Sequence, residues 1–99
     1  MATTSQASKI LLVEDDPFLG GMYVTKLELE HFQVSLATDG EAGLEQAKTF
    51  HPDLILLDIL LPKKDGFTVL QELKADPATM NIPVKIGRAH VWTPVTAID

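Results

Sequence analysis

Two short apolar runs, each ending abruptly at an acidic residue, dominate the hydrophobic pattern of the chain. Residues 10–13 are followed directly by Glu14, and residues 54–57 are followed directly by Asp58. Unbroken apolar runs of this length are typical of strands buried on both faces, as in a parallel sheet. Residues 33–37 alternate between polar and apolar positions instead. This alternation predicts a strand with one face less covered, at the edge of the sheet.

The segments that follow these strands carry helix signals. Asp16 before Pro17, Asp39, and Gly66 mark three helix starts, and two prolines, Pro52 and Pro77, mark ends. Each start is followed by apolar residues at helical spacing, which we expect to face the core. They are Leu19, Met22, Tyr23 and Leu27; Ala42, Leu44, Ala47 and Phe50; and Phe67, Val69, Leu70 and Leu73.

A further strand is predicted to begin at residues 82–84, which gives the order βαβαβαβ. Strands that alternate with helices in this way predict an α/β fold, with right-handed crossovers and a parallel sheet covered by helices.

Composition narrows the class of protein. The 99 residues suffice for one small domain, and 45% hydrophobic with 22% charged residues is an ordinary globular balance. A formal net charge of −6 argues against nucleic-acid binding, and the absence of cysteine excludes disulfides and thiolate metal sites. Nothing resembles a signal peptide or a membrane span. We expect a cytoplasmic domain without a membrane partner.

The acidic residues after the two buried strands form the candidate site. Ligands of open α/β sheets bind outside the carboxyl ends of the strands, where Glu14, Asp15, Asp16 and Asp58 are predicted to converge. Crowded carboxylates are costly unless a cation joins them, and a hard cation such as Mg²⁺ prefers oxygen ligands. A single acid after a strand is more often a helix cap, which is our interpretation of Asp16. The spacing alone does not say which acid reacts.

Residues 9–84 resemble the receiver domains of response regulators, including those of chemotaxis. The similarity lies in residues 10–16 (ILLVEDD), in residues 53–58 (DLILLD), in Leu61-Pro62 and in residues 65–67 (DGF). The resemblance implies a flavodoxin-like, doubly wound parallel sheet. It implies that Asp58 is the phosphoacceptor, and that Mg²⁺ is held by Glu14, Asp15, Asp58 and the backbone carbonyl of Leu60.

The same resemblance implies a role in a two-component phosphorelay. The phosphoryl donor would be a sensor histidine kinase or a phosphotransfer protein, and a downstream effector domain would lie outside this segment. The chain would not be an enzyme, but a phosphoacceptor that assists its own phosphotransfer.

Two alternatives come from other classes. The first is a pseudo-receiver, a binding or dimerisation module that is not phosphorylated. The second is a phosphatase of the haloacid dehalogenase type, which would need a second Asp two residues after the nucleophile. Leu60 occupies that position, which disfavours the phosphatase.

The last residues depart from the receiver pattern. The family's fourth strand should end in a Thr or Ser, and the place of this residue falls near Gly87-Arg88. The family's fifth strand should supply a Lys, and this chain ends before that Lys could occur. Residues 86–96 resemble a translated sequencing-library adapter. We therefore expect a flexible tail over 1–8, a partial receiver over 9–85 that lacks the last helix-strand-helix, and a non-native tail over 86–99. The fourth strand would then be an unprotected sheet edge.

Overall fold

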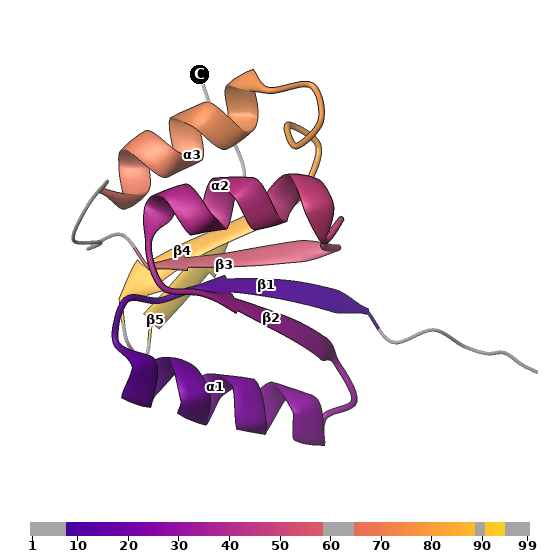
Figure 1. Ribbon diagram of the computed structural model, residues 1–99, viewed down its shortest axis with the longest axis vertical. Helices are drawn as coiled ribbons and strands as arrows, with labels where there is room; N and C mark the ends of the chain where they lie inside the picture. Colours follow the sequence, from indigo (N-terminus) through magenta and orange to yellow (C-terminus); the bar gives the residue numbers. More distant parts are fainter. Residues whose placement is uncertain (1–7, 59–64, 89–90, 95–99) are drawn as a thin grey trace, which may run out of the picture.

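The computed structural model describes residues 8–58, 65–88 and 91–94, and these form five strands and three helices (Figure 1). In chain order they are β1 (Lys9–Val13), α1 (Pro17–Leu29), β2 (Gln33–Ala37), α2 (Gly40–Thr49), β3 (Leu54–Asp58), α3 (Gly66–Ala75), β4 (Val84–Arg88) and β5 (Val91–Pro94).

The strands form one sheet in the order β2-β1-β3-β4-β5, and the first four run parallel. Helix α1 covers one face of the sheet, while α2 and α3 lie side by side on the other (Figure 1). The α/β, flavodoxin-like fold is confirmed, and β2 lies at a sheet edge as its alternating pattern predicts.

The expectation of an open edge at β4 is wrong. Strand β5 pairs antiparallel with β4, with Arg88 opposite Val91 and Lys85 opposite Pro94. The sheet therefore has one strand more than the predicted βαβαβαβ pattern. Pro94 lacks an N–H donor, and proline in sheets is largely confined to edge strands such as β5.

The core has two layers because successive side chains of a strand point to opposite faces. Leu11 and Val13 of β1 belong to the layer under α2 and α3. Ile10 and Leu12 belong to the layer under α1, where Tyr23 and other partly buried residues of α1 pack. The two apolar runs are thus buried on both faces, as predicted.

Aspartates fix the starts of the helices. Asp16 accepts hydrogen bonds from the backbone N–H groups of the first turn of α1, and Asp39 and Asp65 do the same for α2 and α3. Such caps satisfy backbone donors that have no partner within the helix. Two residues of the predicted apolar stripes do not face the core: Met22 is 56% exposed and Phe67 is 55% exposed.

The two adjacent glycines of α1 have different surroundings. A Cβ on Gly20 would lie 3.0 Å from Cδ1 of Leu36 in β2, so α1 approaches the sheet closely at this point. A Cβ on Gly21 would meet nothing within 4 Å. Only Gly20 therefore has a packing reason to lack a side chain.

This difference predicts opposite outcomes for two alanine substitutions. Gly21→Ala should raise the free energy of unfolding by about 1 kcal/mol, because alanine favours a helix over glycine by that amount. Gly20→Ala gains the same preference but forces Leu36 to shift, so it should be less stable than Gly21→Ala by about 1 kcal/mol or more. Urea unfolding followed by circular dichroism measures both, and equal stabilisation would contradict the close approach.

Candidate functional site

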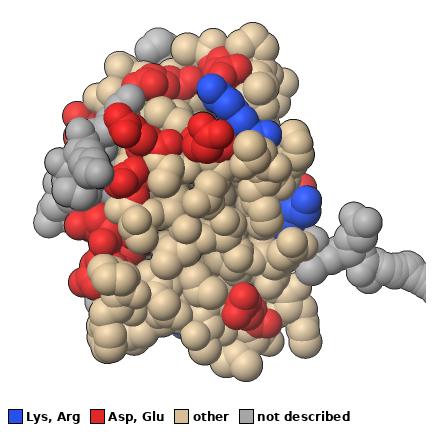
Figure 2. Space-filling view, viewed as in Figure 1, with Lys and Arg blue, Asp and Glu red and all other residues tan. Residues whose placement is uncertain are grey.

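The register between β1 and β3 brings the acidic residues together. Val13 is paired with Leu57, so the residues that follow them in the chain, Glu14 and Asp58, lie side by side at the carboxyl end of the sheet. The N–H of Glu14 also donates to the carbonyl of Ala37 at 2.9 Å, which ties this end of β1 to β2. Acidic side chains gather along this side of the molecule (Figure 2, left).

Three carboxylates form the cluster. One oxygen from each of Glu14, Asp15 and Asp58 lies within 4.8 Å of the other two. The side chains of Glu14 and Asp58 are buried, at 2% and 7% exposure, whereas Asp15 is exposed. The cluster thus has two acids fixed against the sheet and one at its solvent side.

Glu14 is the member with the least favourable surroundings. Its Oε2 accepts a hydrogen bond from the N–H of Asp16 at 3.1 Å, but its Oε1 is buried without a hydrogen-bond partner. Burial, together with the charges of Asp58 and Asp15, raises the pKa of Glu14 to about 7 despite the Asp16 N–H. A buried carboxylate oxygen without a partner, beside two other carboxylates, fits a site for a hard divalent cation.

The structure brings together three of the predicted metal ligands. Asp16 lies outside the cluster and acts as the predicted cap, since its Oδ1 accepts from Phe18 N–H at 2.9 Å and from Leu19 N–H at 3.3 Å. The predicted carbonyl ligand, Leu60, lies outside the described residues.

Two glycines lie near the cluster: Gly87, which the receiver pattern already placed near the site, and Gly43, whose position only the structure reveals. Gly87 of β4 is paired with Asp58, so a residue without a side chain lies directly beside the candidate phosphoacceptor. Gly43 of α2 lies above β1, where a Cβ would approach Cγ2 of Val13 to 3.0 Å. Gly43 lets the helix pack closely next to the acidic cluster, and a lone glycine in a helical pattern gives no sequence signal for such a contact.

The chain shares a known family's sequence pattern: the profile of the response regulator receiver domain matches residues 10–97. The chain belongs to this family. The family is that of response regulators, the receivers of two-component signalling, which confirms the predicted functional class.

Its relatives are longer proteins. The receiver is 45% identical over 76 residues to the DNA-binding dual master transcriptional regulator RpaA of Synechocystis, covering 77% of this chain and 32% of that protein. It is 40% identical over 93 residues to the response regulator PleD of Caulobacter vibrioides, covering 94% of this chain and 19% of that protein. The chain therefore spans about a third and about a fifth of these two relatives.

Solved receiver structures share the fold. The N-terminal domain of a response regulator receiver protein from Methanoculleus marisnigri has a TM-score of 0.77 at 41% identity, covering 79% of this chain and 63% of that one. The receiver domain of the sensor histidine kinase PA1611 from Pseudomonas aeruginosa has a TM-score of 0.77 at 30% identity, covering 82% of this chain and 66% of that one. That crystal structure has a magnesium ion coordinated in its active site cleft. Within the described residues of the present receiver, no helix is long and apolar enough to cross a membrane.

The buried Glu14 predicts how stability depends on pH. In magnesium-free buffer the free energy of unfolding should fall as the pH rises from about 4.5 to about 7, because folded Glu14 keeps a proton that the unfolded chain has released. Glu14→Gln removes this slope and should be more stable than the parent at pH 8, by on the order of 2 kcal/mol.

Urea unfolding across this pH range measures the effect. The matched control is Glu45→Gln, which changes an exposed glutamate of α2 and should leave the slope in place. A slope that persists in Glu14→Gln would assign the effect to another group.

Proposed function

We propose that Asp58 accepts the phosphoryl group, and that Glu14, Asp15 and Asp58 hold Mg²⁺ together with the carbonyl of Leu60. The observation that carries the proposal is the cluster of three carboxylates at the ends of β1 and β3, in which a buried oxygen of Glu14 has no hydrogen-bond partner. When bound, Mg²⁺ offsets the negative charge that accumulates as a carboxylate approaches a phosphoryl group.

Asp58 is better suited than the other two acids to act as the nucleophile. It is the last residue of β3, a strand paired on one side with β1 and on the other with β4, so its backbone is held on both sides. Asp15 is exposed and lies beyond the end of β1, and the raised pKa of Glu14 keeps much of that carboxyl neutral near pH 7 without a cation. Fixed geometry lowers the cost of bringing the reacting atoms into line.

The proposed reaction is a phosphotransfer from nitrogen to oxygen. An Asp58 carboxylate oxygen forms a bond to the phosphorus of a phosphohistidine, and the P–N bond breaks with its electron pair returning to the imidazole. The product is an acyl phosphate on Asp58. The donor would be a sensor histidine kinase or a phosphotransfer protein of the cytoplasm. A separate effector domain would respond to the phosphorylation of Asp58. The receiver would assist this transfer without turning over as an enzyme does.

Gly87 favours one alternative function. The resemblance to receivers implies a Thr or Ser hydroxyl near this position, and Gly87, which pairs with Asp58, offers none. A pseudo-receiver that binds or dimerises without being phosphorylated would tolerate this loss. Phosphorylation of the chain itself decides between the two functions.

Small-molecule phosphorylation tests the site. With Mg²⁺ and acetyl phosphate, the receiver should gain one phosphoryl group by intact-protein mass spectrometry, and Asp58→Asn should gain none. Asp15→Asn should reduce the labelling by about tenfold or more, because it removes a cation ligand.

The matched control is Asp16→Asn, one residue from Asp15 but outside the cluster. Asparagine caps a helix as well as aspartate does, so this variant should label like the parent. Labelling of Asp58→Asn would overturn the assignment of the phosphoacceptor. A parent chain that binds Mg²⁺ but is never labelled would support the pseudo-receiver.

A further inference from the structure

Strand β4 carries a lysine where the neighbouring inner strands are apolar. It is paired with β3 on one side and with β5 on the other, yet its second residue, Lys85, is exposed. The second, third and fourth residues of β1 and of β3 are all apolar and buried. Inner strands of a parallel sheet are expected to be continuously apolar, so core packing gives no reason for a cation at this position.

The register places Lys85 on the same face of the sheet as Asp58. Lys85 is paired with Leu56, and Asp58, two residues further along β3, is paired with Gly87. Residues two apart in a strand share a face, and Leu56 belongs to the core layer under α1. From the spacing of strands and the rise per residue, the Cα atoms of Lys85 and Asp58 are roughly 8 Å apart.

No side chain of β4 separates Lys85 from Asp58. The next residue of β4 on this face, toward the carboxyl end of the sheet, is Gly87. The four-carbon stem of a lysine is flexible, so the ammonium group can turn along the strand past the glycine. A phosphoryl group on Asp58 would extend the acidic side chain and shorten the remaining gap.

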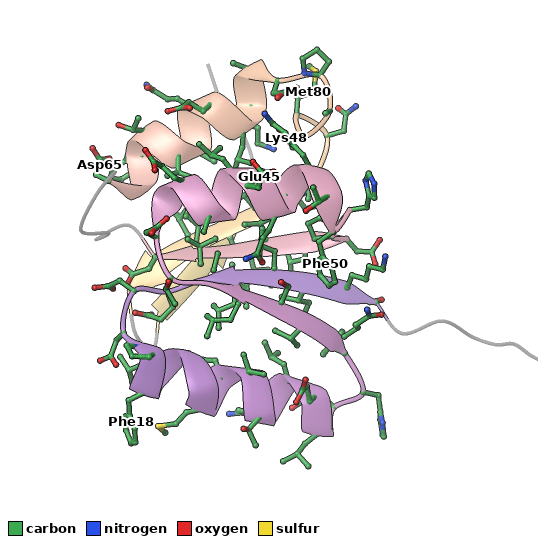
Figure 3. The ribbon with its side chains drawn as sticks, viewed as in Figure 1. Phe18, Glu45, Lys48, Phe50, Asp65 and Met80 are labelled. Carbon is green, nitrogen blue, oxygen red and sulfur yellow. The ribbon has the colours of Figure 1, made fainter. Side chains whose placement is uncertain are left out.

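The other lysines that the structure describes are engaged elsewhere or lie far from the cluster. Figure 3 shows Lys48 extending from α2 toward α3, where it forms an ion pair with Asp76 at 3.4 Å. Lys9 and Lys74 donate to backbone carbonyls, and Lys26 lies in the last turn of α1, whereas the cluster precedes the first turn. Lys85 makes no hydrogen bond or ion pair with another described residue, so its ammonium group is available.

We propose that Lys85 pairs with the phosphoryl group on Asp58 and offsets part of its negative charge. The inference rests on the proposed function, because it needs Asp58 to be phosphorylated. Strand β3 lies between β1 and β4, so Glu14 and Lys85 flank Asp58 from opposite sides. The ammonium group donates hydrogen bonds to a phosphoryl oxygen, and no proton is transferred. A fixed positive charge beside the transferred group stabilises the charge that develops during the transfer.

A lysine in this place should have opposite effects on the two ligands of the site. Its charge attracts the phosphoryl group but repels the cation that the carboxylates hold. Loss of the charge should therefore weaken phosphorylation and strengthen the binding of Mg²⁺. A variant that only damages the fold would weaken both.

Lys85→Gln tests the proposal in the whole chain. At saturating Mg²⁺, its rate of labelling by acetyl phosphate should fall about fivefold or more, as measured by intact-protein mass spectrometry. Its dissociation constant for Mg²⁺ should fall about twofold at low ionic strength, as measured by isothermal titration calorimetry without acetyl phosphate. Lys85→Arg keeps the charge and should stay close to the parent in both measurements.

The matched control is Lys26→Gln, which makes the same change at an exposed lysine remote from the cluster and should alter neither quantity. Labelling of Lys85→Gln at the parent's rate, or an unchanged or weaker affinity for Mg²⁺, would overturn the role of Lys85 and leave that of Asp58 intact. Equal effects of Lys26→Gln would assign the result to net charge and overturn it as well. A parent chain that is never labelled would instead defeat the proposed function, and this inference with it.

Discussion

The parallel pairing of β1 with β3 determines where the charged groups of this receiver lie. Because Val13 is held opposite Leu57, the residues that follow them, Glu14 and Asp58, lie at the same level of the sheet. A slip of one residue would turn every side chain of β1 to the opposite face. It would exchange the two core layers and separate the carboxylates. The hydrophobic pattern that builds the core therefore also maintains the site.

Packing around the buried cluster stabilises the fold, whereas the burial of its carboxylates destabilises it. Val13 and Leu57 are fully buried next to Glu14, and their contacts hold a carboxylate in a place where its charged form is disfavoured. The sheet supplies the stabilisation, while the cluster reduces it at neutral pH. These features fit a cation site, because an ion that neutralises the crowded carboxylate oxygens removes the free-energy cost of burying them in the folded chain. Gly43 adds to the packing by letting α2 lie close above Val13.

Much of this arrangement follows from the sequence, since it depends on local patterns. The runs before Glu14 and Asp58 predict buried strands, and the parallel sheet then brings the acids to one edge. Features that depend on a contact between two elements far apart in the chain do not follow from the sequence. The exposure of Met22 was missed because apolar spacing does not tell which side of an apolar helix meets the core. Strand β5 was missed because its formation depends on a backbone partner in β4, and the role of Gly20 because it depends on Leu36.

Asp16 links the cluster to the helix that follows it. Its N–H donates to Glu14, while its carboxylate holds the first turn of α1 through Phe18 and Leu19. A change in the charge of Glu14 alters the strength of the bond to that N–H, which belongs to the residue that caps the helix. The amide protons of this turn are thus a natural reporter, whose exchange with solvent deuterium would follow the state of the acidic cluster from outside it.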